Sequence, residues 1–220
     1  MAHICEKFDR IGADDPQRRF RLGIMGGTFD PIHFGHLICA EQVRNECALD
    51  AVIFIPAGNP SFKQNQRIAP ATDRLAMCKC AVANNSAFDV SPIEIQRSGI
   101  TYSVDTLNAF RAWYPPNVDF YFIVGADAFA SIEQWYRSSE IAHLAHIIAA
   151  TRPGCAIDDV ACQSLVSRSD FDVNYVPIPE IAISSSMIRH RCEQHQSIRY
   201  LVPDSVASYI DEHHLYEYVE

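Results

Sequence analysis

The sequence predicts an α/β protein with a Rossmann-like, doubly wound fold, in which helices cover both faces of one parallel sheet. Short apolar runs typical of buried strands alternate with longer amphipathic stretches typical of helices. Strands joined through helices in this way run parallel. The 220 residues are enough for one large core and show no internal repeat or break in composition. We therefore predict a loose leader over residues 1–19 and a single domain over residues 20–220 with a C-terminal helical portion.

Each strand is expected where an apolar run is bounded by polar or turn residues. In chain order these runs are Phe20–Met25, Ala51–Pro56, Phe88–Ile95, Val118–Val124, His146–Thr151 and Val173–Ile178. Each helix is expected where apolar residues recur at helical spacing. In chain order these stretches are His36–Cys47, Thr72–Ala83, Val104–Trp113, Asp127–Ser138, Asp158–Ser167, Ser185–Glu193 and Asp204–His213. Ligands of such sheets bind at the carboxyl ends of the strands, so the residues that follow each strand are candidates for function.

Composition excludes several classes of protein. A net charge of −9 argues against a broad nucleic-acid surface. The sequence has no apolar run of about 18 residues that would span a membrane, and its first residues lack the pattern of a secretory signal. Most of the eight cysteines lie inside predicted helices or apolar runs, as reduced thiols of cytoplasmic proteins do. We expect a cytoplasmic protein whose partners are small molecules, and assembly into a homo-oligomer is left open.

The segment after the first strand has the features of a phosphate site. Gly26 and Gly27 end the strand, and His33, Gly35 and His36 stand where the next helix begins. Glycines let a ligand approach the backbone closely, and a helix N-terminus offers free N–H groups and a partial positive charge. Imidazoles add further hydrogen-bond donors. A zinc site is disfavoured here, because no third ligand follows at a recognisable spacing.

Two further groups of residues carry the same chemistry. Ser184 and Ser185 open a predicted helix, where a cap and an anion site are compatible readings. Arg189 lies one turn after Ser185 and can project along the same face. Asp127 follows the strand that ends near Gly125 and can cap a helix, accept from ribose hydroxyls or act through Mg²⁺.

The stretch Gly27-Thr28-Phe29-Asp30-Pro31-Ile32-His33-Phe34-Gly35-His36 resembles the motif of the nucleotidyltransferase superfamily that carries a T/HxGH sequence. Ile183-Ser184-Ser185-Ser186-Met187-Ile188-Arg189 resembles the second motif of that superfamily, whose members join a nucleoside triphosphate to a phosphate-bearing partner. The resemblance implies that His33, His36 and Arg189 are catalytic and that Mg²⁺ enters with ATP. The ATP-binding residues it implies are Gly26, Gly27, Thr28, Phe29, His33, His36, Gly125, Asp127, Ile183, Ser184, Ser185 and Arg189.

Several segments are similar to the branch of this superfamily that acts on nicotinate mononucleotide in bacteria. They are the stretch Glu94–Leu107, the Gly125-Ala126-Asp127 turn and the pair Trp135-Tyr136. The resemblance implies transfer of the adenylyl group of ATP to nicotinate mononucleotide, giving deamido-NAD and pyrophosphate. The residues it implies for nicotinate mononucleotide are Thr28, Lys63, Ser103, Trp135 and Tyr136.

Physical chemistry is consistent with the pyridine site that the resemblance implies. A cationic pyridine ring stacks well on an indole face such as that of Trp135. Backbone N–H groups can distinguish a carboxylate from a carboxamide, and the resemblance implies that those near Ser103 and Tyr136 bind the carboxylate. Phe62 stands before Lys63, at a position where the family usually has histidine. A solvated lysine on the surface loop is the alternative interpretation of Lys63.

Other functions remain open at this point. The acceptor is nicotinamide mononucleotide or phosphopantetheine in one alternative, and the protein is a non-catalytic ATP-binding module in another. A dehydrogenase is disfavoured, because no Gly-x-Gly-x-x-Gly follows the first strand.

Overall fold

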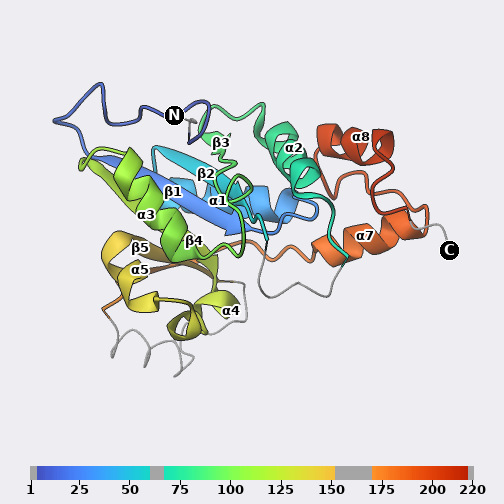
Figure 1. Cartoon of the computed structure of the whole chain (residues 1–220). Coiled ribbons are helices and arrows are strands. Elements are labelled where there is room, and N and C mark those ends of the chain that lie inside the picture. The colour runs from blue at the N-terminus through green and yellow to red at the C-terminus, as the bar shows by residue number, and fades with distance from the viewer. Residues whose placement is uncertain (1–3, 60–66, 152–169, 218–220) are drawn as a thin grey trace.

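The computed structural model describes residues 4–59, 67–151 and 170–217. Its centre is a six-stranded parallel sheet in the order β3-β2-β1-β4-β5-β6 (Figure 1). The strands are β1 (Phe20–Gly27), β2 (Ala51–Pro56), β3 (Phe88–Val90), β4 (Val118–Gly125), β5 (His146–Thr151) and β6 (Val173–Pro177). The strand order reverses between the neighbours β1 and β4, which is the switch point of a doubly wound sheet. The predicted fold class is confirmed.

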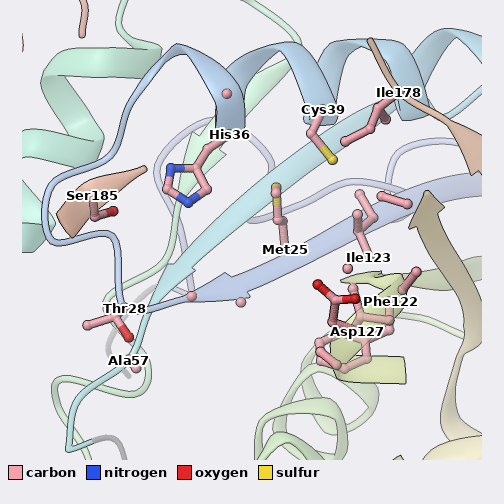
Figure 2. A pocket seen from close by; sticks show the side chains of 18 of the residues that line it. Met25, Thr28, His36, Cys39, Ala57, Phe122, Ile123, Asp127, Ile178 and Ser185 are labelled. Atoms are coloured by element: carbon pink, nitrogen blue, oxygen red, sulfur yellow. The ribbon is translucent and has the colours of Figure 1, made fainter. Parts of the chain in front are cut away.

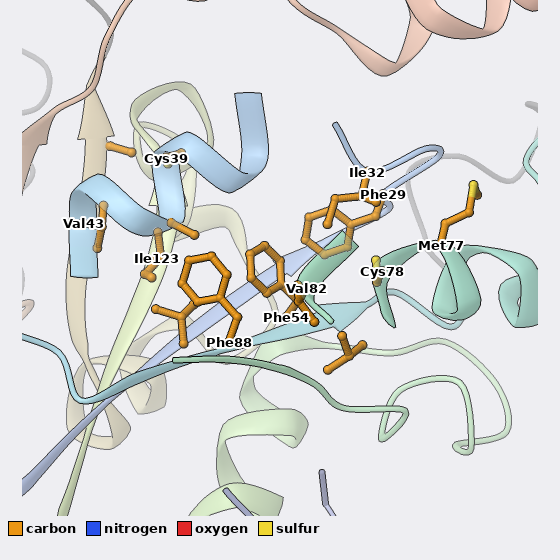
Figure 3. Packing of buried hydrophobic residues seen from close by; sticks show 14 of the residues in the cluster. Phe29, Ile32, Cys39, Val43, Phe54, Met77, Cys78, Val82, Phe88 and Ile123 are labelled. Carbon is orange, nitrogen blue, oxygen red and sulfur yellow. The ribbon is translucent and has the colours of Figure 1, made fainter. Parts of the chain in front are cut away.

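Helices cover both faces of the sheet because successive strand residues point to opposite sides. They are α1 (Phe34–Glu46), α2 (Ala71–Val82), α3 (Ser103–Trp113), α4 (Ala126–Phe129), the 3-10 turn η2 (Ile132–Gln134), α5 (Ser138–Leu144), α7 (Ser185–Glu193) and α8 (Asp204–Glu212). One core cluster joins the sheet to α3, α4, η2 and α5. The other joins it to α1, α2, α7 and α8, and Figure 3 shows Phe29, Phe54 and Phe88 packed within it.

Two predicted elements are wrong in extent. The edge strand β3 ends at Val90 and not at Ile95, because Pro92 has no N–H to continue the ladder. The helix predicted over 127–138 is divided into α4 and η2, and α5 begins only at Ser138. Trp135 has an extended backbone and Arg137 a left-handed one (φ 52°), so the chain turns there. The helix predicted over 158–167 lies outside the described residues.

The predicted leader is not loose, although the domain boundary at residue 19 stays a prediction. Ile4 and Cys5 are buried, and Phe8 packs against the core cluster that contains them. The Lys7 ammonium donates to the carbonyl oxygens of Asn85 (3.0 Å) and Phe88 (2.8 Å). The leader therefore holds the edge of the sheet beside β3.

The thiols of the described part are free, as the sequence predicts: Cys5, Cys39, Cys47, Cys78, Cys80 and Cys192. Among the helices of this part, none has the length and apolar character needed to cross a membrane.

Candidate active site

A cavity of about 870 Å³ opens at the carboxyl ends of the central strands. Its walls come from the end of β1, the start of α1, the β4–α4 turn and the chain before α7. Twelve of the predicted site residues line it: Gly26, Gly27, Thr28, His33, His36, Ser103, Gly125, Asp127, Trp135, Ile183, Ser184 and Ser185. In Figure 2 the ring of His36 points from α1 into this space, and the Asp127 side chain faces it from another wall.

The two histidines at the start of α1 form a stacked pair. Their ring centroids are 3.8 Å apart, and the Phe29 ring packs edge to face with the His36 ring, with centroids 5.0 Å apart. The backbone N–H of His33 donates to Nδ1 of His36 (3.3 Å). This leaves Nε2 to carry the proton of the neutral His36 ring. Burial, and then the charge of His33, lowers the pKa of His36 to about 3. His36 is therefore a neutral hydrogen-bond donor at physiological pH.

The glycines of the motif serve packing as well as ligand access. A Cβ on Gly35 would lie 3.0 Å from the His33 ring, and a Cβ on Gly27 would lie 2.8 Å from the Phe29 ring. A Cβ on Gly26 would meet only Phe122 at 4.0 Å. Of these three glycines, Gly26 is the one that leaves open space at the cavity wall.

The serines at the start of α7 are already engaged in hydrogen bonds. Ser184 caps the helix by accepting from the N–H of Met187 (3.2 Å). The Ser185 hydroxyl donates to the carbonyl oxygen of Pro31 (2.9 Å), which ties α7 to the motif loop. Both residues line the cavity, and the phosphate contacts predicted for them stay a prediction.

Three predicted site residues have side chains outside the cavity lining. Phe29 is buried beneath the loop, and Arg189 donates to the Asp30 carbonyl oxygen (2.8 Å). Tyr136 is 53% exposed and its ring packs on Tyr102. Lys63 lies outside the described residues. The ligand contacts predicted for these residues stay predictions.

Two buried charged residues that sequence reasoning did not place in the site hold the motif loop. Asp30 is 2% exposed, and its Oδ1 accepts from the Ala69 N–H (3.1 Å). Arg74 is also 2% exposed and donates to the carbonyl oxygens of Thr28 (2.8 Å) and Ala69 (3.1 Å). Burial lowers the pKa of Arg74, and the nearby Asp30 opposes that shift.

The cavity wall on the α3 side carries polar and aromatic groups. Thr101, Ser103 and Trp135 line it, and the Trp135 ring meets Phe122 edge to face at 6.1 Å. Glu94 also lines this wall and was not predicted as a site residue. It accepts from the Thr106 hydroxyl (2.8 Å), and burial raises its pKa.

No group of three or more His, Cys, Asp or Glu side chains in the described ranges is arranged to hold a metal ion. Asp127 presents an exposed carboxylate in the first turn of α4, where it lines the cavity. One such carboxylate fits an ion that takes most of its ligands from phosphate oxygens and water, as Mg²⁺ does.

Comparison with known proteins agrees with this geometry. Residues 24–191 match the cytidylyltransferase-like family model. A probable nicotinate-nucleotide adenylyltransferase of Dehalococcoides mccartyi is 45% identical over 205 residues, covering 89% of this chain and 97% of the relative. One of Desulfitobacterium hafniense is 46% identical over 198 residues, covering 89% and 95%. The chain belongs to the nicotinate-nucleotide adenylyltransferase family.

Solved structures support the fold of this nicotinate-nucleotide adenylyltransferase family member. A nicotinic acid mononucleotide adenylyltransferase of Plasmodium falciparum, complexed with APC, has a TM-score of 0.73 at 20% identity, covering 91% of this chain and 99% of its own. A putative nicotinate-nucleotide adenylyltransferase of Vibrio parahaemolyticus has a TM-score of 0.60 at 17% identity, covering 91% and 97%.

Proposed function

We propose that this chain transfers the adenylyl group of ATP to nicotinate mononucleotide, giving deamido-NAD and pyrophosphate. One observation carries the proposal: two motifs far apart in the chain line the same cavity. His33 and His36 reach it from the start of α1, and Ser184 and Ser185 from the start of α7. Two helix N-termini and two imidazoles at one cavity suit a ligand with several phosphates.

The reaction needs positioning and charge stabilisation more than a protein nucleophile. A phosphate oxygen of nicotinate mononucleotide attacks the α-phosphorus of ATP, a P–O bond forms, and the bond to the pyrophosphate oxygen breaks. His36, neutral and with its proton on Nε2, donates to the phosphate oxygens where negative charge develops. Arg189, held by its hydrogen bond to the Asp30 carbonyl oxygen, is the cation that the proposal assigns to the triphosphate.

The two substrates fit different walls of the cavity. Figure 2 shows Thr28 and Ala57 at one side of the cavity and Cys39 and Ile178 at another. The apolar wall near Ile178 suits an adenine ring. The wall with Trp135 suits the pyridine ring, and the free N–H groups at the start of α3 near Ser103 suit its carboxylate.

Mg²⁺ belongs to the proposal as the ion that accompanies ATP. It would neutralise charge on the triphosphate, with Asp127 as its carboxylate partner from the protein. The remaining predicted binding residues, Thr28 and Lys63 among them, are part of the same proposal.

The experiment that tests the proposal is pyrophosphate release from ATP and Mg²⁺ with nicotinate mononucleotide and nicotinamide mononucleotide in parallel. We expect release with the acid and little with the amide. Equal release with both would keep the adenylyl transfer and reject the carboxylate site. No release with either would reject both pyridine acceptors, and phosphopantetheine would be the next acceptor tested.

A further inference from the structure

A tyrosine near the end of the chain makes a buried contact with the motif loop. Tyr216 follows α8 and is 6% exposed, and its hydroxyl donates to Oδ1 of Asp30 (2.8 Å). Asp30 lies between β1 and α1 and is 2% exposed. Figure 1 shows the described part of the chain after α8 running back toward α7, the helix that carries Arg189. The contact therefore joins the end of the chain to the loop that carries the histidines.

Asp30 connects both phosphate-facing segments. Its carbonyl oxygen accepts from Nη1 of Arg189 (2.8 Å), and its Oδ2 lies 3.7 Å from the same nitrogen. The next residue, Pro31, accepts from the Ser185 hydroxyl (2.9 Å). A shift of Asp30 would thus move the loop before α1 and the start of α7 relative to each other.

The backbone at both ends of the contact adopts a conformation that non-glycine residues rarely occupy. Phe29, beside Asp30, has φ 49°, and Tyr216 has φ 66°. Side chains in this left-handed region cost free energy and persist only where their surroundings hold them. The Phe29 ring packs edge to face with the His36 ring, with ring centroids 5.0 Å apart. Relaxation of Phe29 would therefore displace the imidazole.

We infer that Tyr216 is a positioning residue for adenylyl transfer, because its hydroxyl fixes Asp30 and, through Asp30, the geometry of His36 and Arg189. Neither Tyr216 nor Asp30 lines the cavity, so Tyr216 acts through the loop and does not touch substrate. The inference rests on the proposed function.

The test compares Tyr216→Phe with Tyr209→Phe. Tyr209, on α8, donates to Oδ1 of Asp73 (2.9 Å), so each variant loses one tyrosine–carboxylate hydrogen bond. A misplacement of about 1 Å costs up to about 10²-fold in rate. We expect kcat to fall about 10-fold or more in Tyr216→Phe, with KM for nicotinate mononucleotide unchanged and an unfolding midpoint close to that of Tyr209→Phe. An inactive wild-type protein would contradict the proposed function and is seen before any variant is compared.

Equal kcat values for the two variants would overturn the inference. A much lower unfolding midpoint for Tyr216→Phe would also overturn it, because the hydroxyl would then stabilise the fold in general. A second experiment measures kcat of the double variant that combines Tyr216→Phe with Asp30→Ala. If Tyr216 acts through Asp30, the double variant is no slower than Asp30→Ala alone, and a further loss of the same size would contradict that route. If Asp30→Ala is unfolded, the comparison of the two tyrosine variants decides.

Discussion

The imidazole of His36 is kept neutral by its surroundings. Its Nδ1 accepts from the His33 N–H, and burial together with His33 lowers its pKa to about 3. A neutral ring whose Nδ1 accepts this bond donates from Nε2 at any pH well above 3. His33 thus fixes the tautomer of His36 and helps to keep its ring neutral.

This pKa predicts a contribution of His36 to acid sensitivity. The folded ring titrates near 3 and an unfolded histidine near 6.5, so the unfolded chain binds more protons between these values. The free energy of unfolding then falls as the pH falls through this window. From pH 7 to pH 5 the wild-type protein should lose up to about 2 kcal/mol more than His36→Gln. Urea unfolding of both proteins at the two pH values measures the difference, and equal losses would contradict the neutral ring.

Trp135 is predicted to stack on the pyridine ring of the acceptor. Stacking of a cationic ring on an indole contributes about 0.5–2 kcal/mol, so Trp135→Ala should raise KM for nicotinate mononucleotide about 2- to 30-fold. KM for ATP should stay within about twofold, because the adenine is placed at another wall. Initial rates with each substrate varied in turn provide the measurement. An equal rise for both substrates would place Trp135 outside the pyridine site.

At the scale of elements, the leader behaves as part of the sheet edge. The Lys7 side chain donates to the carbonyl oxygens of Asn85, in the turn after α2, and of Phe88 in β3. The indole of Trp113 donates to the Asp9 carbonyl oxygen (3.0 Å). These contacts cover an edge strand of three residues. The leader thus protects the shortest strand of the sheet.

Ile4 tests this reading of the leader. It is 5% exposed, so Ile4→Ala should lower the free energy of unfolding by about 2 kcal/mol or more. The matched control is Ile100→Ala, because Ile100 is 41% exposed and should cost less than about 0.5 kcal/mol. Urea unfolding measures both. A loss for Ile4→Ala no larger than for the control would mean that the leader contributes nothing to stability.

The accuracy of the element predictions follows from where the stabilising contacts lie. β2, β5 and α7 have the predicted bounds, because their ends coincide with local changes in apolar pattern or with a capping serine. The break around Arg137 escaped prediction; Arg137 has a left-handed backbone there, and Trp135 contacts Phe122 on the distant strand β4. Local periodicity contains no record of such a contact.

At the scale of the whole molecule, the site depends on contacts between distant segments. Asp30 meets Tyr216, and Arg74 meets the loops after β1 and β2. The sequence identifies the chemical groups of the cavity because motifs are local. It does not identify these buried polar contacts, because the residues that make them come together only once the chain has folded.

Arg74 provides a prediction at this scale. Arg74→Met keeps an apolar stem but leaves the carbonyl oxygens of Thr28, Ala69 and Gly58 without this donor. The free energy of unfolding should fall by about 3 kcal/mol. Arg10→Met is the control, because the Arg10 side chain is 77% exposed beside Asp14 and should cost about 0–1 kcal/mol. Similar losses for the two variants, measured by urea unfolding, would show that Arg74 does not hold the loops together.

The central claim is that the start of α1 stabilises the developing charge of adenylyl transfer. The most direct test is kcat of His36→Ala with ATP and nicotinate mononucleotide, beside His143→Ala as the control. His143 and His146 repeat the His-x-x-His spacing, and His143 is exposed on α5 away from the cavity. We predict a fall of about 10²–10³-fold for His36→Ala, with a folded protein and with His143→Ala within about twofold of the wild type. A folded His36→Ala protein with an unchanged kcat would contradict the account.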